Sequence, residues 1–247
     1  KKWKKKDSYT LKDMTHDAIT VLDSLKIVKA HIVGVSMGGI IAQIIALDYP
    51  YKASSLTCMM SSADIADSEL PPMSKKILPK MISTVFKHGF FGSKKGQIKR
   101  QIVQKKILMG EATGDVDMKS IAEIAAYNLR KRDGFKLLSA RHHYWAMLHS
   151  ESRIEALKNL KLPTLIIHGK KDPVIPIAHG EKIAAIVMNA DSLYIENMGH
   201  DLPDSALNKM TGKIISHFSK VQNRVKKIPE NQERSFLNCC GANDNKE

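Results

Sequence analysis

Three short motifs in this 247-residue chain contain the residue types that serine enzymes use. Ser36 lies between two glycines in GVSMGG, residues 34–39, after an apolar run that ends at Val33 and before another that begins at Ile40. A strand that turns into a helix within a few residues needs small neighbours, and the residue at the apex projects its side chain away from the sheet. The pattern therefore predicts a nucleophile elbow with Ser36 at its apex.

A serine hydroxyl is a weak nucleophile, so it needs a histidine base and an acid that orients the imidazole. Asp172 follows a short apolar run, residues 163–169, and His200 follows a second candidate strand at 192–196. Asp-Pro is a common turn, and a lone Gly-His carries little information. The joint occurrence of nucleophile, acid and base in this chain order, each after a candidate strand, predicts a Ser-Asp-His triad.

Apolar periodicity predicts the elements that would position these residues. It indicates helices at 10–25, 37–48, 178–188 and 204–219, and strands at 30–35, 54–60, 164–168 and 192–196. Because strands alternate with helices, the fold class is α/β with a mostly parallel sheet.

A long segment interrupts this alternation. Residues 64–150 show helical periodicity at 77–86, 98–109, 118–130 and 135–149, which predicts a helical lid inserted into the core. The core would then be discontinuous, comprising residues 1–63 and 151–220. Residues 221–247 are mostly polar and are expected to form a flexible tail.

The stretches GVSMGG, LIIHGKKDPVIP with AHGEKIA, and ENMGHDLP together resemble the α/β-hydrolases, most closely the aclacinomycin methylesterase-like carboxylesterases. The resemblance covers most of residues 9–219. It implies an α/β-hydrolase fold with a helical lid, in which Ser36 is the nucleophile, Asp172 the acid and His200 the general base. It also implies that the backbone N–H of Met37 is one oxyanion donor.

The chain departs from the family pattern at its start. Members of this family have several strands ahead of the helix that precedes the elbow, and a turn among them supplies the second oxyanion N–H. Here Lys1 is followed almost at once by the helix predicted at 10–25. The resemblance therefore implies an N-terminally incomplete chain, with the front strands and the second donor missing. His168-Gly169 is no substitute, because it lies in the strand that leads to Asp172.

These observations predict a serine hydrolase that cleaves carboxylic esters of small apolar molecules through an acyl-enzyme, without a cofactor or metal. Ser36 at the apex excludes epoxide hydrolases and haloalkane dehalogenases, which need an aspartate there. Two alternatives stay open. One is a cofactor-free haloperoxidase or perhydrolase with the same triad, and the other is a non-catalytic remnant of the hydrolase fold.

Composition is consistent with one catalytic domain, since 43% of residues are hydrophobic and no run reaches membrane-spanning length. The three cysteines, Cys58, Cys239 and Cys240, are too few for a disulfide framework and favour a reducing, cytoplasmic setting. The expected partner is a small-molecule ester. The oligomeric state is left open.

The net charge of +14 is unevenly distributed. Residues 70–110 hold ten lysines or arginines and no acidic residue. Such a block attracts anions through its long-range field, but charge runs more often form a solvated helix face. Because only Phe86, Phe90 and Phe91 are interleaved with it, we expect no specific nucleic-acid partner.

Overall fold

The structure, a computed structural model, describes residues 9–88, 93–110, 118–131 and 137–226. The first two residues of the helix expected at 135–149, most of the expected tail, and Cys239 and Cys240 lie outside these ranges.

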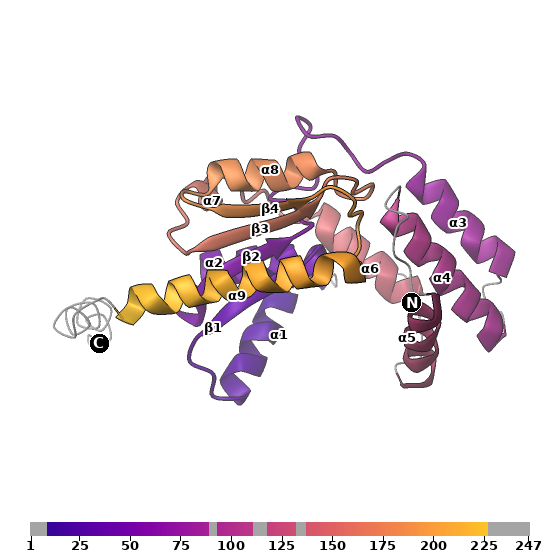
Figure 1. The fold of residues 1–247 in the computed structure, drawn as a ribbon, viewed down its shortest axis with the longest axis horizontal. Coiled ribbons are helices and arrows are strands. Elements are labelled where there is room, and N and C mark those ends of the chain that lie inside the picture. Colours follow the sequence, from indigo (N-terminus) through magenta and orange to yellow (C-terminus); the bar gives the residue numbers. More distant parts are fainter. Residues whose placement is uncertain (1–8, 89–92, 111–117, 132–136, 227–247) are drawn as a thin grey trace.

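Four parallel strands form one sheet in the order β1-β2-β3-β4. They are β1 (Ala30–Val35), β2 (Ala53–Met59), β3 (Thr164–Gly169) and β4 (Asp191–Ile195). Val35 pairs with Met59, Met59 with Ile167, and Gly169 with Ile195, so the strands end along a common edge (Figure 1). The expected parallel α/β sheet is confirmed, and every predicted strand lies within one residue of its observed bounds.

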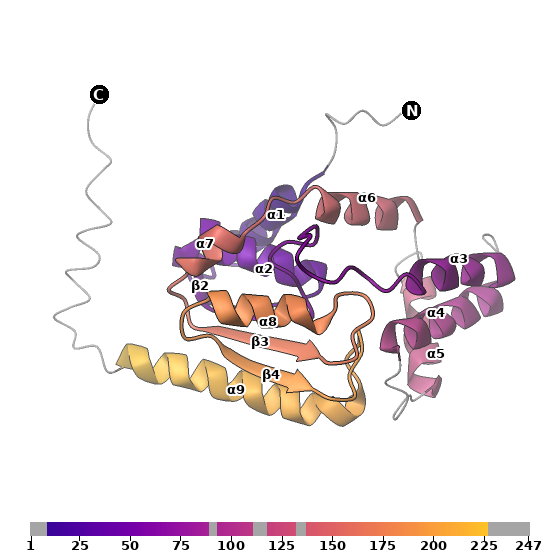
Figure 2. The same ribbon diagram turned by 90° about the horizontal axis from the view of Figure 1, so that it is seen from above.

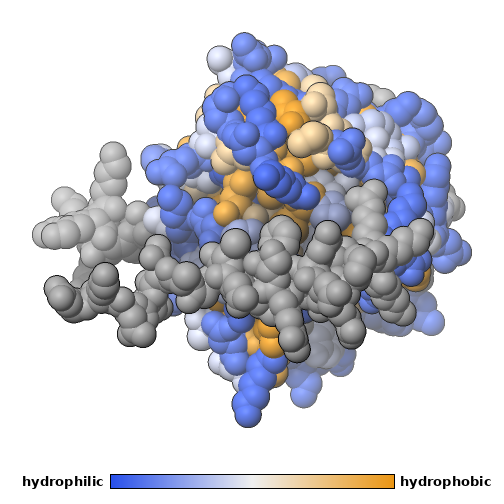
Figure 3. Space-filling model, turned by 90° about the vertical axis from the view of Figure 1, so that its left-hand side faces the viewer, coloured by the Kyte–Doolittle hydropathy of each residue, from blue (hydrophilic) through white to orange (hydrophobic). Residues whose placement is uncertain are grey.

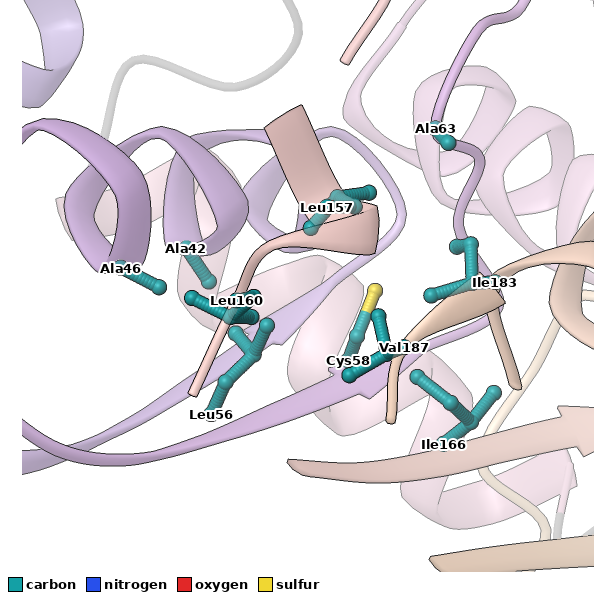
Figure 4. Packing of buried hydrophobic residues seen from close by; sticks show 10 residues of the cluster. All are labelled: Ala42, Ala46, Leu56, Cys58, Ala63, Leu157, Leu160, Ile166, Ile183 and Val187. Carbon is teal, nitrogen blue, oxygen red and sulfur yellow. The ribbon is translucent and has the colours of Figure 1, made fainter. Parts of the chain in front are cut away.

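One face of the sheet packs against α2 (Met37–Asp48), α7 (Ile154–Lys158) and α8 (Ile177–Ile186). Side chains of a strand point alternately to its two faces, and Leu56, Cys58 and Ile166 point to this one. Figure 4 shows these three side chains gathered with residues of all three helices. The helices predicted at 37–48 and 178–188 are confirmed, whereas α7 was not predicted.

The opposite face packs against α9 (Asp204–Lys226), which makes a three-layer arrangement (Figure 2). Met59, Leu165 and Ile167 meet Ala206 and Met210 of α9 there. Both faces of β2 and β3 are therefore covered, which explains their nearly continuous apolar sequences.

Helix α1 (Leu11–Ser24) begins with a capping box and packs against α2. The Thr10 hydroxyl accepts the Asp13 N–H, and the Asp13 carboxylate accepts the Thr10 N–H, so two unpaired donors of the first turn are satisfied. Leu11 is buried against Ile40 and Ile44 of α2. This contact stabilises the helix that starts at the predicted elbow.

Within the described part of residues 64–150, four helices precede α7, as the periodicity predicts. They are α3 (Ile77–His88), α4 (Lys94–Met109), α5 (Met118–Lys131) and α6 (Leu137–Leu148). Helix α4 contacts both α3 and α5, and this group lies beyond the edge at which the strands end (Figures 1 and 2).

The last helix is longer than the sequence predicts. It continues to Lys226, so the expected end at residue 219 and the expected start of the tail at 221 are wrong. Val221 explains the difference, because its side chain is only 7% exposed and lines a hollow with Pro163 and Met188. This hollow lies at the end where the strands begin; Figure 3 views that end, where hydrophobic side chains lie among hydrophilic ones.

The elbow glycines offer a test of this packing. A Cβ on Gly34 would lie 2.0 Å from the carbonyl oxygen of Gly38, whereas a Cβ on Gly38 would meet nothing within 4 Å. We expect Gly34→Ala to lower the free energy of unfolding by about 3 kcal/mol, because the backbone of β1 or α2 must shift. Gly38→Ala is the matched control and should raise it by about 0.5 to 1 kcal/mol through helix propensity. Urea unfolding measures both, and equal stability of the two variants would contradict the close approach.

Candidate active site

The turn between β1 and α2 holds Ser36 in a conformation that serine rarely adopts, with φ 55° and ψ −119°. Its N–H donates to the carbonyl of Met59 at 2.8 Å, which ties the turn to the end of β2. A serine at the start of a helix usually turns its hydroxyl to the N–H groups of the first turn. Ser36 makes no such bond, so its side chain is available to another partner.

That partner is His200, which lies in the loop after β4. The His200 Nε2 is 2.9 Å from the Ser36 Oγ, and the His200 Nδ1 is 2.8 Å from the Asp172 Oδ2. When Nδ1–H donates to the carboxylate, Nε2 is the unprotonated nitrogen and accepts the serine O–H. The structure therefore brings the three residues together in the order that the sequence predicts.

Asp172 lies in the loop after β3 and has a fully buried side chain. Its Oδ1 accepts the N–H groups of Val174 and Ile175 at 2.8 and 2.9 Å, and its Oδ2 lies 3.5 Å from the His168 Nε2. Burial alone would raise the pKa of Asp172, but hydrogen bonds from His168 and His200, the positive charge that His200 can carry, and the Ile175 N–H together hold that pKa below its ordinary value. The carboxylate is thus kept ionised beside the imidazole.

The sequence gives no role to His168 beyond its place in the strand. The structure buries it completely, and its Nε2–H donates to the carbonyl of Ile175 at 2.9 Å. Since the Ile175 N–H also donates to Asp172, the hydrogen bond of His168 stabilises the loop that carries Asp172.

Met37, the expected oxyanion donor, is the first residue of α2. The first N–H groups of a helix have no partner within it, and the helix dipole adds positive potential there. The N–H of Met37 follows the Ser36 carbonyl directly, which places a donor beside the Ser36 side chain.

The inserted segment reaches the site through the last turn of α4, a contact that the sequence did not predict. The N–H of His200 donates to the carbonyl of Leu108 at 2.9 Å. A Cβ on Gly199 would lie 2.2 Å from the carbonyl oxygen of Met109. Gly199 was the only signal in the sequence, since a glycine before the histidine allows a close approach without saying what approaches.

In the ranges that the structure describes, no group of three or more His, Cys, Asp or Glu side chains is arranged to hold a metal ion. In the same ranges, no helix is both long and apolar enough to cross a bilayer. A cavity of about 880 Å³ lies at the opposite end of α2 from Ser36, lined in part by Leu11, Ile44 and Trp145. Its lining includes none of the three hydrogen-bonded residues.

Comparison with known proteins agrees with this architecture. A family model described as alpha/beta hydrolase fold matches residues 1–207. The chain is 28% identical over 233 residues to rhodomycin D methylesterase of Streptomyces peucetius, covering 85% of this chain and 73% of that protein. It is 26% identical over 201 residues to a monoacylglycerol lipase of Homo sapiens, covering 78% of this chain and 56% of that protein. The expected resemblance to methylesterases is confirmed.

Solved structures show the same fold. An esterase from Exiguobacterium antarcticum has a TM-score of 0.62 at 18% identity, covering 87% of this chain and 75% of that chain. A meta-cleavage product hydrolase from Pseudomonas fluorescens has a TM-score of 0.61 at 20% identity, covering 88% and 74%. With the family model matching most of its length, the chain belongs to the alpha/beta hydrolase fold family.

Proposed function

We propose that this protein is a serine hydrolase that cleaves carboxylic esters of small, largely apolar molecules. The observation that carries the proposal is the continuous hydrogen-bonded series from the Ser36 hydroxyl through His200 to the buried carboxylate of Asp172. The positive φ of Ser36 supports it, because strained backbone is retained where the surrounding structure enforces it, often at an active site.

In the proposed mechanism, the Nε2 of His200 accepts the Ser36 proton while the Ser36 Oγ attacks the ester carbonyl carbon. The N–H of Met37 stabilises the negative charge that develops on the carbonyl oxygen. The imidazolium, held by Asp172, then donates its proton to the departing alcohol oxygen, which leaves an acyl-enzyme. Water attacks that ester with His200 again as the base, and the acid is released.

The substrate class rests on the relatives. One is a methylesterase and another a monoacylglycerol lipase, and both names denote hydrolysis of carboxylic esters. At 28% and 26% identity these relatives support the reaction class more than any particular alcohol or acyl group.

The reaction class is tested by assaying the protein for ester hydrolysis and for peroxide-dependent halogenation. We expect saturable release of p-nitrophenol from short-chain p-nitrophenyl esters, and much slower peroxide-dependent halogenation of a dye in acetate buffer. Protein treated beforehand with a fluorophosphonate is the matched control and should do neither. Halogenation without ester hydrolysis would replace the proposal with a perhydrolase, and a folded protein inactive in both assays would indicate a non-catalytic member of the fold.

A further inference from the structure

Next to His200, a buried acidic side chain pairs with a lysine of the inserted segment. Asp201 is only 7% exposed, and its Oδ1 forms an ion pair with the Nζ of Lys105 on α4. The same oxygen accepts the Leu202 N–H at 2.6 Å. A buried carboxylate without a partner is strongly destabilising, so Asp201 requires a cation at this position.

One turn further along α4, the helix backbone makes a second contact with the loop that contains His200 and Asp201. The carbonyl of Leu108 accepts the N–H of His200, as described above. Residues 105 and 108 are three apart and therefore lie on the same face of the helix. The last carbonyls of a helix have no partner within it, so this bond satisfies one of them. Two successive residues of the loop, His200 and Asp201, are thus held by one face of α4.

The end of α4 also contacts the loop that carries the acid. Gly110 has φ 63°, and a Cβ there would lie 3.2 Å from the carbonyl oxygen of Lys171 and from Pro173. Ahead of α3, the N–H of Ser74 donates to the carbonyl of Pro173 at 2.9 Å. Figure 1 shows α4 between α3 and α5, beyond the ends of the strands. The inserted segment therefore contacts both loops of the site.

We propose that Lys105 is a positioning residue, whose ion pair with Asp201 holds the His200 loop against α4 so that the imidazole meets Ser36 in a reactive geometry. This inference rests on the proposed function. A displacement of about 1 Å between reacting groups can lower a rate about a hundredfold. Loss of the ion pair can therefore lower kcat even when substrate binding is unchanged. Lys105 thus departs from the solvated helix face that was expected for the basic block.

The experiment compares Lys105→Met with Lys106→Met, which removes the same charge and side chain one residue further along α4. Lys106 is exposed and has no ion pair among the described residues. We expect Lys105→Met to lower kcat for a p-nitrophenyl ester about 30-fold with KM changed less than twofold. Lys106→Met should leave both constants as in the wild type. Lys105→Arg, which keeps the cation, should retain most of kcat.

Hydrogen exchange provides a readout that does not depend on hydrolysis. The amide proton of His200, which bonds to Leu108, should exchange about tenfold faster in Lys105→Met than in Lys106→Met. Asp201→Asn removes the buried charge with little change of shape. It should also lower kcat and speed the exchange of the His200 amide, and it takes the place of Lys105→Met if that variant folds poorly. In the double variant the effects should not add, because both substitutions remove the same contact.

The outcomes separate the two proposals. Equal kcat and equal His200 exchange in Lys105→Met and Lys106→Met would overturn the positioning role. If Lys105→Arg lost as much kcat as Lys105→Met, the positioning role would also be overturned, because the cation would then not be the feature that matters. The wild type could also hydrolyse no ester while the His200 amide still exchanges faster in Lys105→Met than in Lys106→Met. That result would overturn the proposed function and support the contact between Lys105 and Asp201.

Discussion

Replacing Ser36 with alanine is expected to lower kcat for ester hydrolysis on the order of a millionfold, the scale seen when a serine triad loses its nucleophile. In the proposed mechanism the Ser36 Oγ, which is hydrogen-bonded to the His200 Nε2, is the attacking atom, so no covalent intermediate would form without it. The measurement is p-nitrophenol release at saturating substrate, together with covalent labelling by a fluorophosphonate. The wild type should be labelled and Ser36→Ala should not.

Ser219→Ala is the control for this substitution. Ser219 is exposed on α9, and among the described residues its hydroxyl donates only to the carbonyl of Ile215 within its own helix. This variant should be labelled and should turn over substrate like the wild type. Equal labelling of Ser36→Ala and wild type would mean that another residue is the nucleophile.

Asp172→Asn should lower kcat about ten thousandfold, while KM changes only a few-fold. The amide keeps the size of the side chain but removes the charge that stabilises the imidazolium. It also allows the histidine tautomer in which Nε2 carries the proton and no longer accepts from Ser36. Steady-state kinetics on one ester separates kcat from KM, and an Asn variant that keeps most of its kcat would show that the acid lies elsewhere.

Acid stability of the same variant checks the environment of the carboxylate. Because the pKa of Asp172 is held below its ordinary value in the folded protein, its ionised form stabilises the fold. This contribution is complete above the pKa of an unfolded aspartate, about 3.9, and is lost as the pH falls through the lower folded pKa. The free energy of unfolding of the wild type should therefore fall more steeply below about pH 4 than that of Asp172→Asn.

Much of the core follows from local sequence signals. The strand at 30–35 and the helix at 37–48 have their predicted bounds, because Gly34 and Ser36 mark the turn between two apolar runs. Helix α7 was missed because its five residues are too few to show a helical period. The end of α9 was missed because Val221 is an isolated apolar residue in a polar stretch, and only the folded structure shows that it is buried.

The proximity of Ser36, Asp172 and His200 could be predicted because parallel strands end at the same edge of a sheet. What the sequence does not reveal is the surroundings of these residues. The bond from His200 to Leu108 and the pairing of Lys105 come from the docking of a separate helical segment, for which no local pattern exists. Lys105 is one of ten basic residues in its block, and nothing in the spacing distinguishes it from Lys106.

The pairing of β2 with β3 has a consequence for how the chain folds. Met59 ends β2 and pairs with Ile167 of β3, although the whole inserted segment lies between them in the sequence. Loop-closure entropy grows only with the logarithm of length, so a loop of about a hundred residues costs about 2 kcal/mol more than one of about ten. Contacts so distant in sequence slow folding far more than they reduce stability. A change in the length of the inserted segment should therefore alter mainly the rate at which the sheet assembles, with little effect on the equilibrium between folded and unfolded chains.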